Sequence, residues 1–87
     1  MLCAASCHDK DELAHAAELG VDFAVLGPVL PTPSHPMAAP LGWTRFAELV
    51  RGMPLPVYAL GGLERADLAV AMEHGAHGVA LRRSAWR

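Results

Sequence analysis

The clearest indication of the architecture is PVYALGGLERADLAVAMEHGAHGVAL, residues 56–81. It begins with the apolar run Val57 to Leu60, passes through a glycine pair into a segment with helical spacing of apolar residues, and ends with the apolar run Gly78 to Leu81. Neither run alternates polar and apolar residues, which is typical of strands covered on both faces of a parallel sheet. The stretch therefore predicts a strand, a helix from Glu64 to His74 and a second parallel strand.

The same order of elements is predicted nearer the N-terminus. Apolar runs at Leu2 to Ala5 and at Phe23 to Leu26 predict two further strands. Between them, Asp9 followed three residues later by Glu12 has the pattern of a capping box, and Gly20 has the position of a helix C-cap. We therefore expect a helix of about three turns between these strands.

The remaining helix assignments come from apolar residues at helical spacing. The segment from Trp43 to Val50 places its aromatic and aliphatic residues on one face. In the last predicted helix, Leu68, Ala71 and Met72 are expected to face the core.

An internal repeat supports this order. AELGVDFAVL, residues 17–26, and MEHGAHGVAL, residues 72–81, each read as a helix end, a turn centred on glycine and a strand. The chain is thus predicted to consist of two (βα)2 repeats. A complete TIM (β/α)8 barrel has eight β/α units in about 250 residues. We therefore interpret residues 1–87 as a single partial domain of the α/β class, half of a TIM barrel with about four β/α units and parallel strands.

Half a barrel would leave surface uncovered. The 87 residues are 53% hydrophobic, which fits one compact unit. A chain of this size buries only about 60–65% of its unfolded surface. The first and last strands would also carry unpaired N–H and C=O groups. We therefore expect self-association or a missing N-terminal half to cover what stays exposed.

Charge and hydropathy argue against several partners. The net charge is −2, and the Lys and Arg residues are scattered until Arg82, Arg83 and Arg87, so no basic stripe suits nucleic acid. No apolar run approaches the roughly 18 residues of a membrane span, and no secretory signal is recognised, so a cytoplasmic location is expected. Cys3 and Cys7 lack the spacing of a zinc site and are expected to be reduced thiols.

Candidate functional residues follow the predicted strands. In barrels the active face is formed by loops after the strand carboxyl ends. Gly61 and Gly62 lack Cβ atoms, so backbone N–H groups there can approach a phosphate oxygen. Arg82 and Arg83 follow the last strand and offer donors for the same anion. The alternatives are a tight turn at the glycines and a solvated basic tail.

A proline-rich segment supplies the remaining candidates. GPVLPTPSHPMAAPLG, residues 27–42, is a long loop of the kind that usually has a function. Within it Thr32 and Ser34 offer hydroxyl groups and His35 offers an imidazole. Ser6, directly after the first predicted strand, is expected to donate to a ligand oxygen. The alternative is that the loop is a rigid structural Ω-loop.

Several motifs together resemble a known family. ASCHD (5–9), LGPVLPTPSH (26–35), APLGW (39–43), PVYALGGL (56–63) and GVALRRSAW (78–86) are similar to thiamine phosphate synthase and its relative TenI. The resemblance runs nearly end to end and covers the family's last four β/α units, which implies the C-terminal half of a TIM barrel. In detail it is most similar to the TenI-like domain that follows a Nudix (MutT-like) hydrolase domain in some bacterial fusion proteins.

The resemblance implies a substrate class and binding roles. The family's enzyme, a thiamine-phosphate diphosphorylase, joins hydroxymethylpyrimidine pyrophosphate to thiazole phosphate. Ser6 matches a serine that contacts the pyrophosphate. The segment from Thr32 to Ser34 matches the thiazole-phosphate loop, and Gly61 with Gly62 matches the glycines at that phosphate. A small phosphorylated ligand, thiazole phosphate or similar, is therefore the expected partner.

The chain also departs from the family's pattern. His35 stands where the synthase has lysine, so a permanent cation is replaced by an imidazole that is mostly neutral at pH 7. Arg82 and Arg83 replace a small apolar residue and a serine, and Pro28 stands where TenI has a histidine. The resemblance implies Mg²⁺ for the whole enzyme, with its acidic ligands and the pyrimidine pocket in the N-terminal half that this chain lacks.

These observations leave three hypotheses. The first is a phosphate-binding half-barrel linked to thiamine biosynthesis or salvage that is not catalytically complete alone. The second is an accessory C-terminal domain of a Nudix hydrolase. The third is a non-catalytic binding or oligomerisation module.

Overall fold

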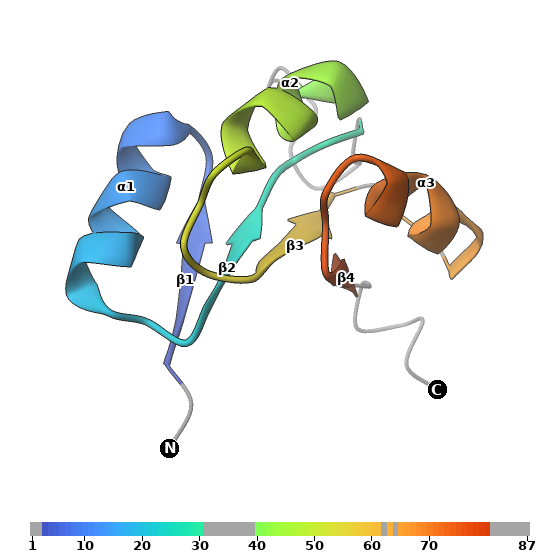
Figure 1. Ribbon diagram of the computed structural model, residues 1–87. Helices are drawn as coiled ribbons and strands as arrows, with labels where there is room; N and C mark the ends of the chain where they lie inside the picture. Colours follow the sequence, from blue (N-terminus) through green and yellow to red (C-terminus); the bar gives the residue numbers. More distant parts are fainter. Residues whose placement is uncertain (1–2, 31–39, 62, 64, 81–87) are drawn as a thin grey trace.

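The computed structural model describes residues 3–30, 40–61, 63 and 65–80. Strands and helices alternate along this part of the chain, as the sequence predicts (Figure 1). In order the elements are β1 (Ala4–Cys7), α1 (Lys10–Leu19), β2 (Phe23–Leu26), α2 (Gly42–Val50), β3 (Val57–Leu60), a 3-10 turn (Arg65–Asp67), α3 (Leu68–Glu73) and β4 (Gly78–Ala80).

The four strands form one parallel sheet whose spatial order is the sequence order, β1-β2-β3-β4. Across the sheet Ser6 pairs with Val25, Val25 with Tyr58, and Tyr58 with Gly78. A doubly wound sheet reverses its strand order near the middle, whereas the wall of a β/α barrel advances one strand at a time. The fold class predicted from the sequence is therefore confirmed.

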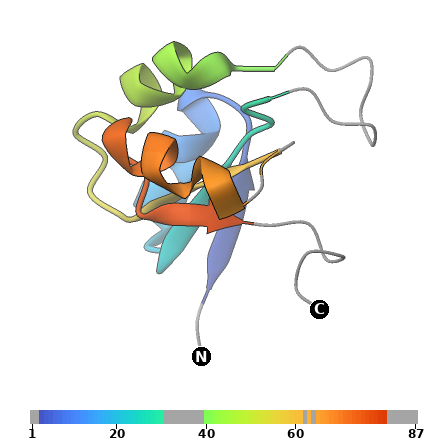
Figure 2. The same cartoon turned by 90° about the vertical axis from the view of Figure 1, so that its right-hand side faces the viewer.

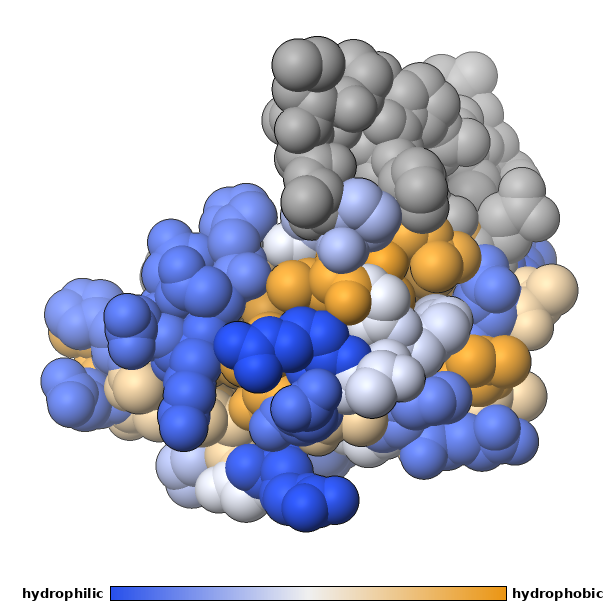
Figure 3. All heavy atoms as spheres, turned by 90° about the horizontal axis from the view of Figure 1, so that it is seen from above, coloured by the Kyte–Doolittle hydropathy of each residue, from blue (hydrophilic) through white to orange (hydrophobic). Residues whose placement is uncertain are grey.

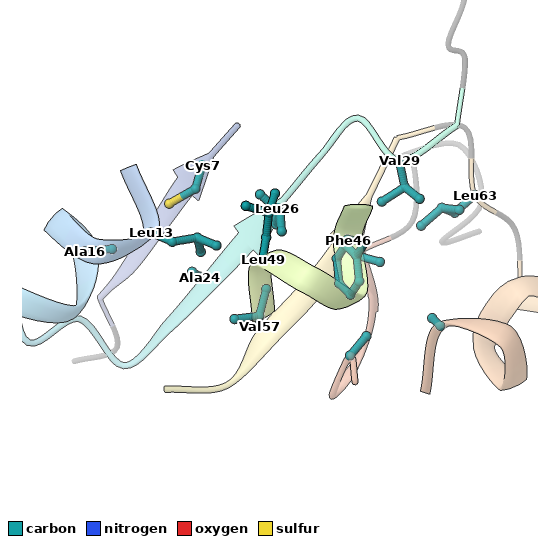
Figure 4. Packing of buried hydrophobic residues seen from close by; sticks show 13 residues of the cluster. Cys7, Leu13, Ala16, Ala24, Leu26, Val29, Phe46, Leu49, Val57 and Leu63 are labelled. Atoms are coloured by element: carbon teal, nitrogen blue, oxygen red, sulfur yellow. The ribbon is translucent and has the colours of Figure 1, made fainter. Parts of the chain in front are cut away.

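Right-handed crossovers that always advance in one direction place every helix on the same face of the sheet. Burial along the strands agrees with this arrangement. In β2 and β3 the residues Ala24, Leu26, Val57 and Ala59 are buried, while the residues that alternate with them are only half-buried. Between this buried face and the helices lies the core (Figure 4), in which Phe46 of α2, Leu13 of α1 and Leu26 are among the largest fully buried side chains.

The opposite face of the sheet, which we call the inner face, carries Phe23, Val25, Tyr58 and Leu60 from the two central strands. Phe23 and Tyr58 meet edge to face with their ring centroids 5.4 Å apart. All four side chains are half-buried, and the helices of the described chain pack on the other side (Figure 2). The inner face is thus a largely apolar surface with incomplete cover.

The predicted internal repeat appears as repeated hydrogen bonds. α1 and α3 are both followed by a glycine with positive φ, +73° at Gly20 and +96° at Gly75. Each end has the Schellman pattern, with these donor to acceptor distances: Gly20 N to Ala17 O 3.2 Å, Val21 N to Ala16 O 3.4 Å, Gly75 N to Met72 O 3.1 Å and Ala76 N to Ala71 O 3.0 Å. The two helix ends therefore turn the chain into the next strand in the same way.

Two details of the sequence prediction were wrong. The first strand is Ala4–Cys7, two residues later than predicted, because Cys3 O accepts from Asp22 N at the strand start and Cys7 O still accepts from Gly27 N. The last helix begins at Leu68, after the 3-10 turn, and Leu68 and Met72 are 42% and 57% exposed. Helical spacing identifies an apolar stripe but not what covers it, and only Ala71 of the three predicted core residues is buried.

Within the described residues, no helix is both long enough and apolar enough to cross a membrane.

Candidate functional site

All four strands are parallel, so their carboxyl ends lie at one edge of the sheet, which we call the rim. The segments that leave β1, β2 and β3 at the rim begin with His8, Gly27 and Gly61. A view from above shows apolar side chains near the middle of this side of the molecule, interrupted by hydrophilic ones (Figure 3). The candidate residues are therefore to be sought at this edge.

The segment after β2 lies directly against the end of β3. Val29 N donates to Leu60 O at 2.8 Å, and Leu30 N donates to Gly61 O at 3.2 Å. A Cβ atom on Gly27 would lie 2.2 Å from Leu60 O, and one on Gly61 would lie 2.6 Å from Pro28 Cα. Only glycine at both positions permits this approach, so the glycines bring two candidate loops together.

The long proline-rich loop also returns to the rim. Leu41 N donates to Pro28 O and Gly42 N donates to Val29 O, both at 2.8 Å. These two bonds tie the start of α2 to the segment after β2. The loop therefore leaves and rejoins the sheet at neighbouring points, and both points lie beside the end of β3.

At the end of β1, a carboxylate holds an imidazole. Asp9 caps α1 by accepting from Glu12 N at 2.8 Å. Glu12 Oε1 accepts in turn from His8 N at 2.6 Å and lies 2.9 Å from His8 Nδ1. The N-cap predicted at Asp9 is confirmed, but Glu12 accepts from His8 N and not from Asp9 N, as the predicted capping box requires. Sequence reasoning missed that Glu12 orients His8, although their spacing of four residues is typical of such a pair.

Cys7, next to this pair, is a buried thiol. Burial raises the pKa of Cys7, and the negative charges of Glu12 and Asp9 raise it further. A thiol in this environment stays neutral at pH 7 and is a poor nucleophile. The chemistry available at this end of the sheet is hydrogen bonding and not thiolate attack.

Two of the candidate residues, Ser6 and Gly61, lie in the described part of the chain. Ser6 lies in β1 on the inner face and is exposed, and Gly61 lies directly after β3 at the rim. Sequence reasoning put Ser6 after its strand, whereas it is the third residue of the strand. The other candidates lie outside the described residues: Thr32, Ser34, His35, Gly62, Arg82 and Arg83. The binding roles of all eight candidates, Ser6 and Gly61 included, stay predictions.

The Mg²⁺ expected for the whole family enzyme can be tested against the donors present. Among the described residues, no group of three or more His, Cys, Asp or Glu side chains gathers in a way that could hold a metal ion. The described part of this chain therefore does not fit the role of a magnesium site.

The chain is similar over most of its length to proteins of one known family. The family profile described as "Thiamine monophosphate synthase" matches residues 1–85. A putative thiamine-phosphate synthase of Geobacter sulfurreducens is 41% identical over 81 residues, which cover 92% of this chain and 38% of that protein. The thiamine-phosphate synthase of Myxococcus xanthus is 43% identical over 70 residues, covering 78% of this chain and 32% of that protein.

Structural comparison agrees. Thiamine phosphate pyrophosphorylase from Pyrococcus furiosus superposes with a TM-score of 0.76 at 27% sequence identity, over 90% of this chain and 37% of that one. This chain thus spans well under half the length of the relatives that it matches. Since the family profile matches almost every residue, the chain belongs to the thiamine monophosphate synthase family.

Proposed function

We propose that this chain is the phosphate-binding half of a thiamine phosphate synthase-like barrel, and that its ligand is thiazole phosphate or a closely related small phosphate. The observation that carries the proposal is the contact between the segment after β2 and the end of β3 at Gly27 and Gly61. It supports a shared anion site because the phosphate-binding motifs of the family fall on the continuations of these two segments.

The chemistry of the proposed site is hydrogen bonding to an anion. Backbone N–H groups at Gly61 and Gly62 and hydroxyl groups at Thr32 and Ser34 donate to phosphate oxygens. Arg82 and Arg83 add charge where relatives have neutral residues, and His35 contributes a cation only when protonated. Ser6, in the edge strand β1, offers a further hydroxyl group. The predicted cytoplasmic location suits a small phosphorylated ligand.

We further propose that synthesis of thiamine phosphate requires more than residues 1–87, which form a single partial domain. The chain covers 38% of the Geobacter sulfurreducens relative. The pyrimidine pocket and the acidic ligands of Mg²⁺ are assigned to the remaining part of such proteins. The role of this chain is then to hold the thiazole phosphate so that its ring nitrogen faces the incoming pyrimidine.

Isothermal titration calorimetry with thiazole phosphate tests the binding. We expect saturable heat with the wild-type chain and at least about tenfold weaker binding for Gly62→Asp, since a carboxylate beside a phosphate costs well over 1 kcal/mol. Gly52→Asp is the matched control, because Gly52 follows α2 at the end of the sheet away from the rim. Folded wild-type protein that gives no heat, or equal weakening by both variants, would contradict the proposal.

The two other hypotheses predict different outcomes. A non-catalytic oligomerisation module predicts no heat with thiazole phosphate from a folded sample. The accessory role beside a Nudix hydrolase concerns sequence outside these residues and stays a prediction. Reading the encoding DNA upstream of Met1 for a glutamate-rich Nudix helix, or for four further β/α units, distinguishes it from the first hypothesis.

A further inference from the structure

Both edge strands of the sheet have one free side. Among the described residues, β1 pairs with β2 alone and β4 pairs with β3 alone. Each edge therefore presents a row of backbone N–H and C=O groups that can pair with another parallel strand.

The internal repeat indicates which strand can pair with each free edge. At the start of β2, Asp22 N donates to Cys3 O at 2.8 Å, and at the start of β4, His77 N donates to Val57 O at 2.9 Å. With the matching helix ends after Gly20 and Gly75, these bonds make β1 the counterpart of β3 and β2 the counterpart of β4. The free edge of β4 thus corresponds to the edge that β2 offers to β3, and the free edge of β1 corresponds to the one that β3 offers to β2.

The helices next to the two free edges are also incompletely covered. Leu68 of α3 is 42% exposed, whereas its counterpart Leu13 of α1 is fully buried. On the other flank Leu19 of α1 is 66% exposed and borders a groove of about 310 Å³, which Ala5 and Cys7 also line. Apolar surface therefore accompanies both free edges.

We propose that two copies of this chain associate through these edges and close an eight-stranded barrel, with β4 of each copy beside β1 of the other. The β2–β3 junction, in which Ala24 lies beside Val57 and Val25 beside Tyr58, is the template. Its counterpart at the seam places Val79 beside Cys3 of the second copy and Ala80 beside Ala4. Because both seams are the same, the pair has twofold symmetry. The proposal is independent of ligand binding.

Closure also accounts for the inner face. The interior of an eight-stranded barrel is filled by side chains and contains no open channel. Phe23, Val25, Tyr58 and Leu60 of both copies would face one another there, so that their half-buried apolar surface leaves water. The exposed apolar residues of α1 in one copy and α3 in the other would flank the same seam.

Sedimentation velocity of the wild-type chain gives the first test. We expect a single species with twice the chain mass over a wide range of concentrations. A folded monomer would overturn the proposal, and so would an open series of larger oligomers, because a ring of two copies leaves no free edge.

A cysteine pair tests the register at the seam. Val79 and Cys3 are both expected on the helix-covered face, and neighbouring parallel strands lie about 4.8 Å apart, within the range of Cα separations that a disulfide spans. Val79→Cys should therefore form an interchain disulfide with the exposed native Cys3. Ala69→Cys, on the exposed side of α3, is the control and should not. Equal cross-linking of both variants would overturn the register.

A charge on the inner face separates a closed barrel from any other dimer. Val25→Asp would place a carboxylate inside the barrel, where burial without a partner is strongly unfavourable, yet the face stays open to water in a monomer. We expect a monomer with an unchanged circular dichroism spectrum, whereas Thr44→Asp on the exposed side of α2 leaves the dimer intact. If Val25→Asp is still a dimer, the copies do not enclose this face.

Discussion

Gly27 leaves no room for a side chain, because its missing Cβ atom would overlap the carbonyl oxygen of Leu60. This oxygen is the acceptor that holds Val29 against the end of β3. One glycine therefore sets the distance between the two segments on which the proposed phosphate site depends.

Gly27→Ala should lower the free energy of unfolding by about 3 kcal/mol, the upper end of the usual effect of overpacking, because backbone atoms cannot move aside easily. Urea denaturation followed by circular dichroism measures the change. Gly52→Ala is the control, since Gly52 has φ +75° but no atom within 4 Å of an added Cβ, and it should lose only about 1 kcal/mol. Losses as small as that of the control would mean that the segment after β2 moves away from Leu60 O at little cost.

Among the helices of the described chain, α1 is the one in which capping bonds close both the first and the last turn. Its first turn is closed by Asp9 and Glu12, and its last turn ends in the Schellman motif at Gly20. Asp9→Ala removes the acceptor for Glu12 N and should lower the free energy of unfolding by about 1 kcal/mol. Asp11→Ala, in the same turn but without a capping bond, should lose only about 0.3 kcal/mol in the same denaturation experiment. Similar losses for both would assign the effect to the helix dipole.

The contrast between α1 and α3 shows what the sequence could predict. Capping residues and glycine turns act within a few residues, so the bounds of α1 and the positions of β2 and β3 were confirmed. The exposure of Leu68 and Met72 depends on what lies beyond β4, which no local pattern encodes. Likewise, the glycine pair at 61 and 62 could be recognised as a candidate phosphate-binding turn from the sequence. The close contact of Gly27 with Leu60 could not, because it joins residues far apart in the sequence.

At the scale of the whole molecule, association and stability are linked. If two chains form the native barrel, unfolding also separates them, so higher chain concentration stabilises the folded form. We expect the midpoint of thermal unfolding to rise steadily over a hundredfold increase in concentration for the wild-type chain. Val25→Asp should show no such rise. A wild-type midpoint that does not depend on concentration would argue for a monomeric fold.

The matching bonds at Asp22 and His77 have one more consequence. A wall built from units that all join in the same manner can be lengthened by duplicating a segment, and the added piece needs no new kind of contact. No residue then has to specify how many units the finished molecule contains. That number follows from the curvature of the sheet, because the wall closes when its last strand can pair with its first.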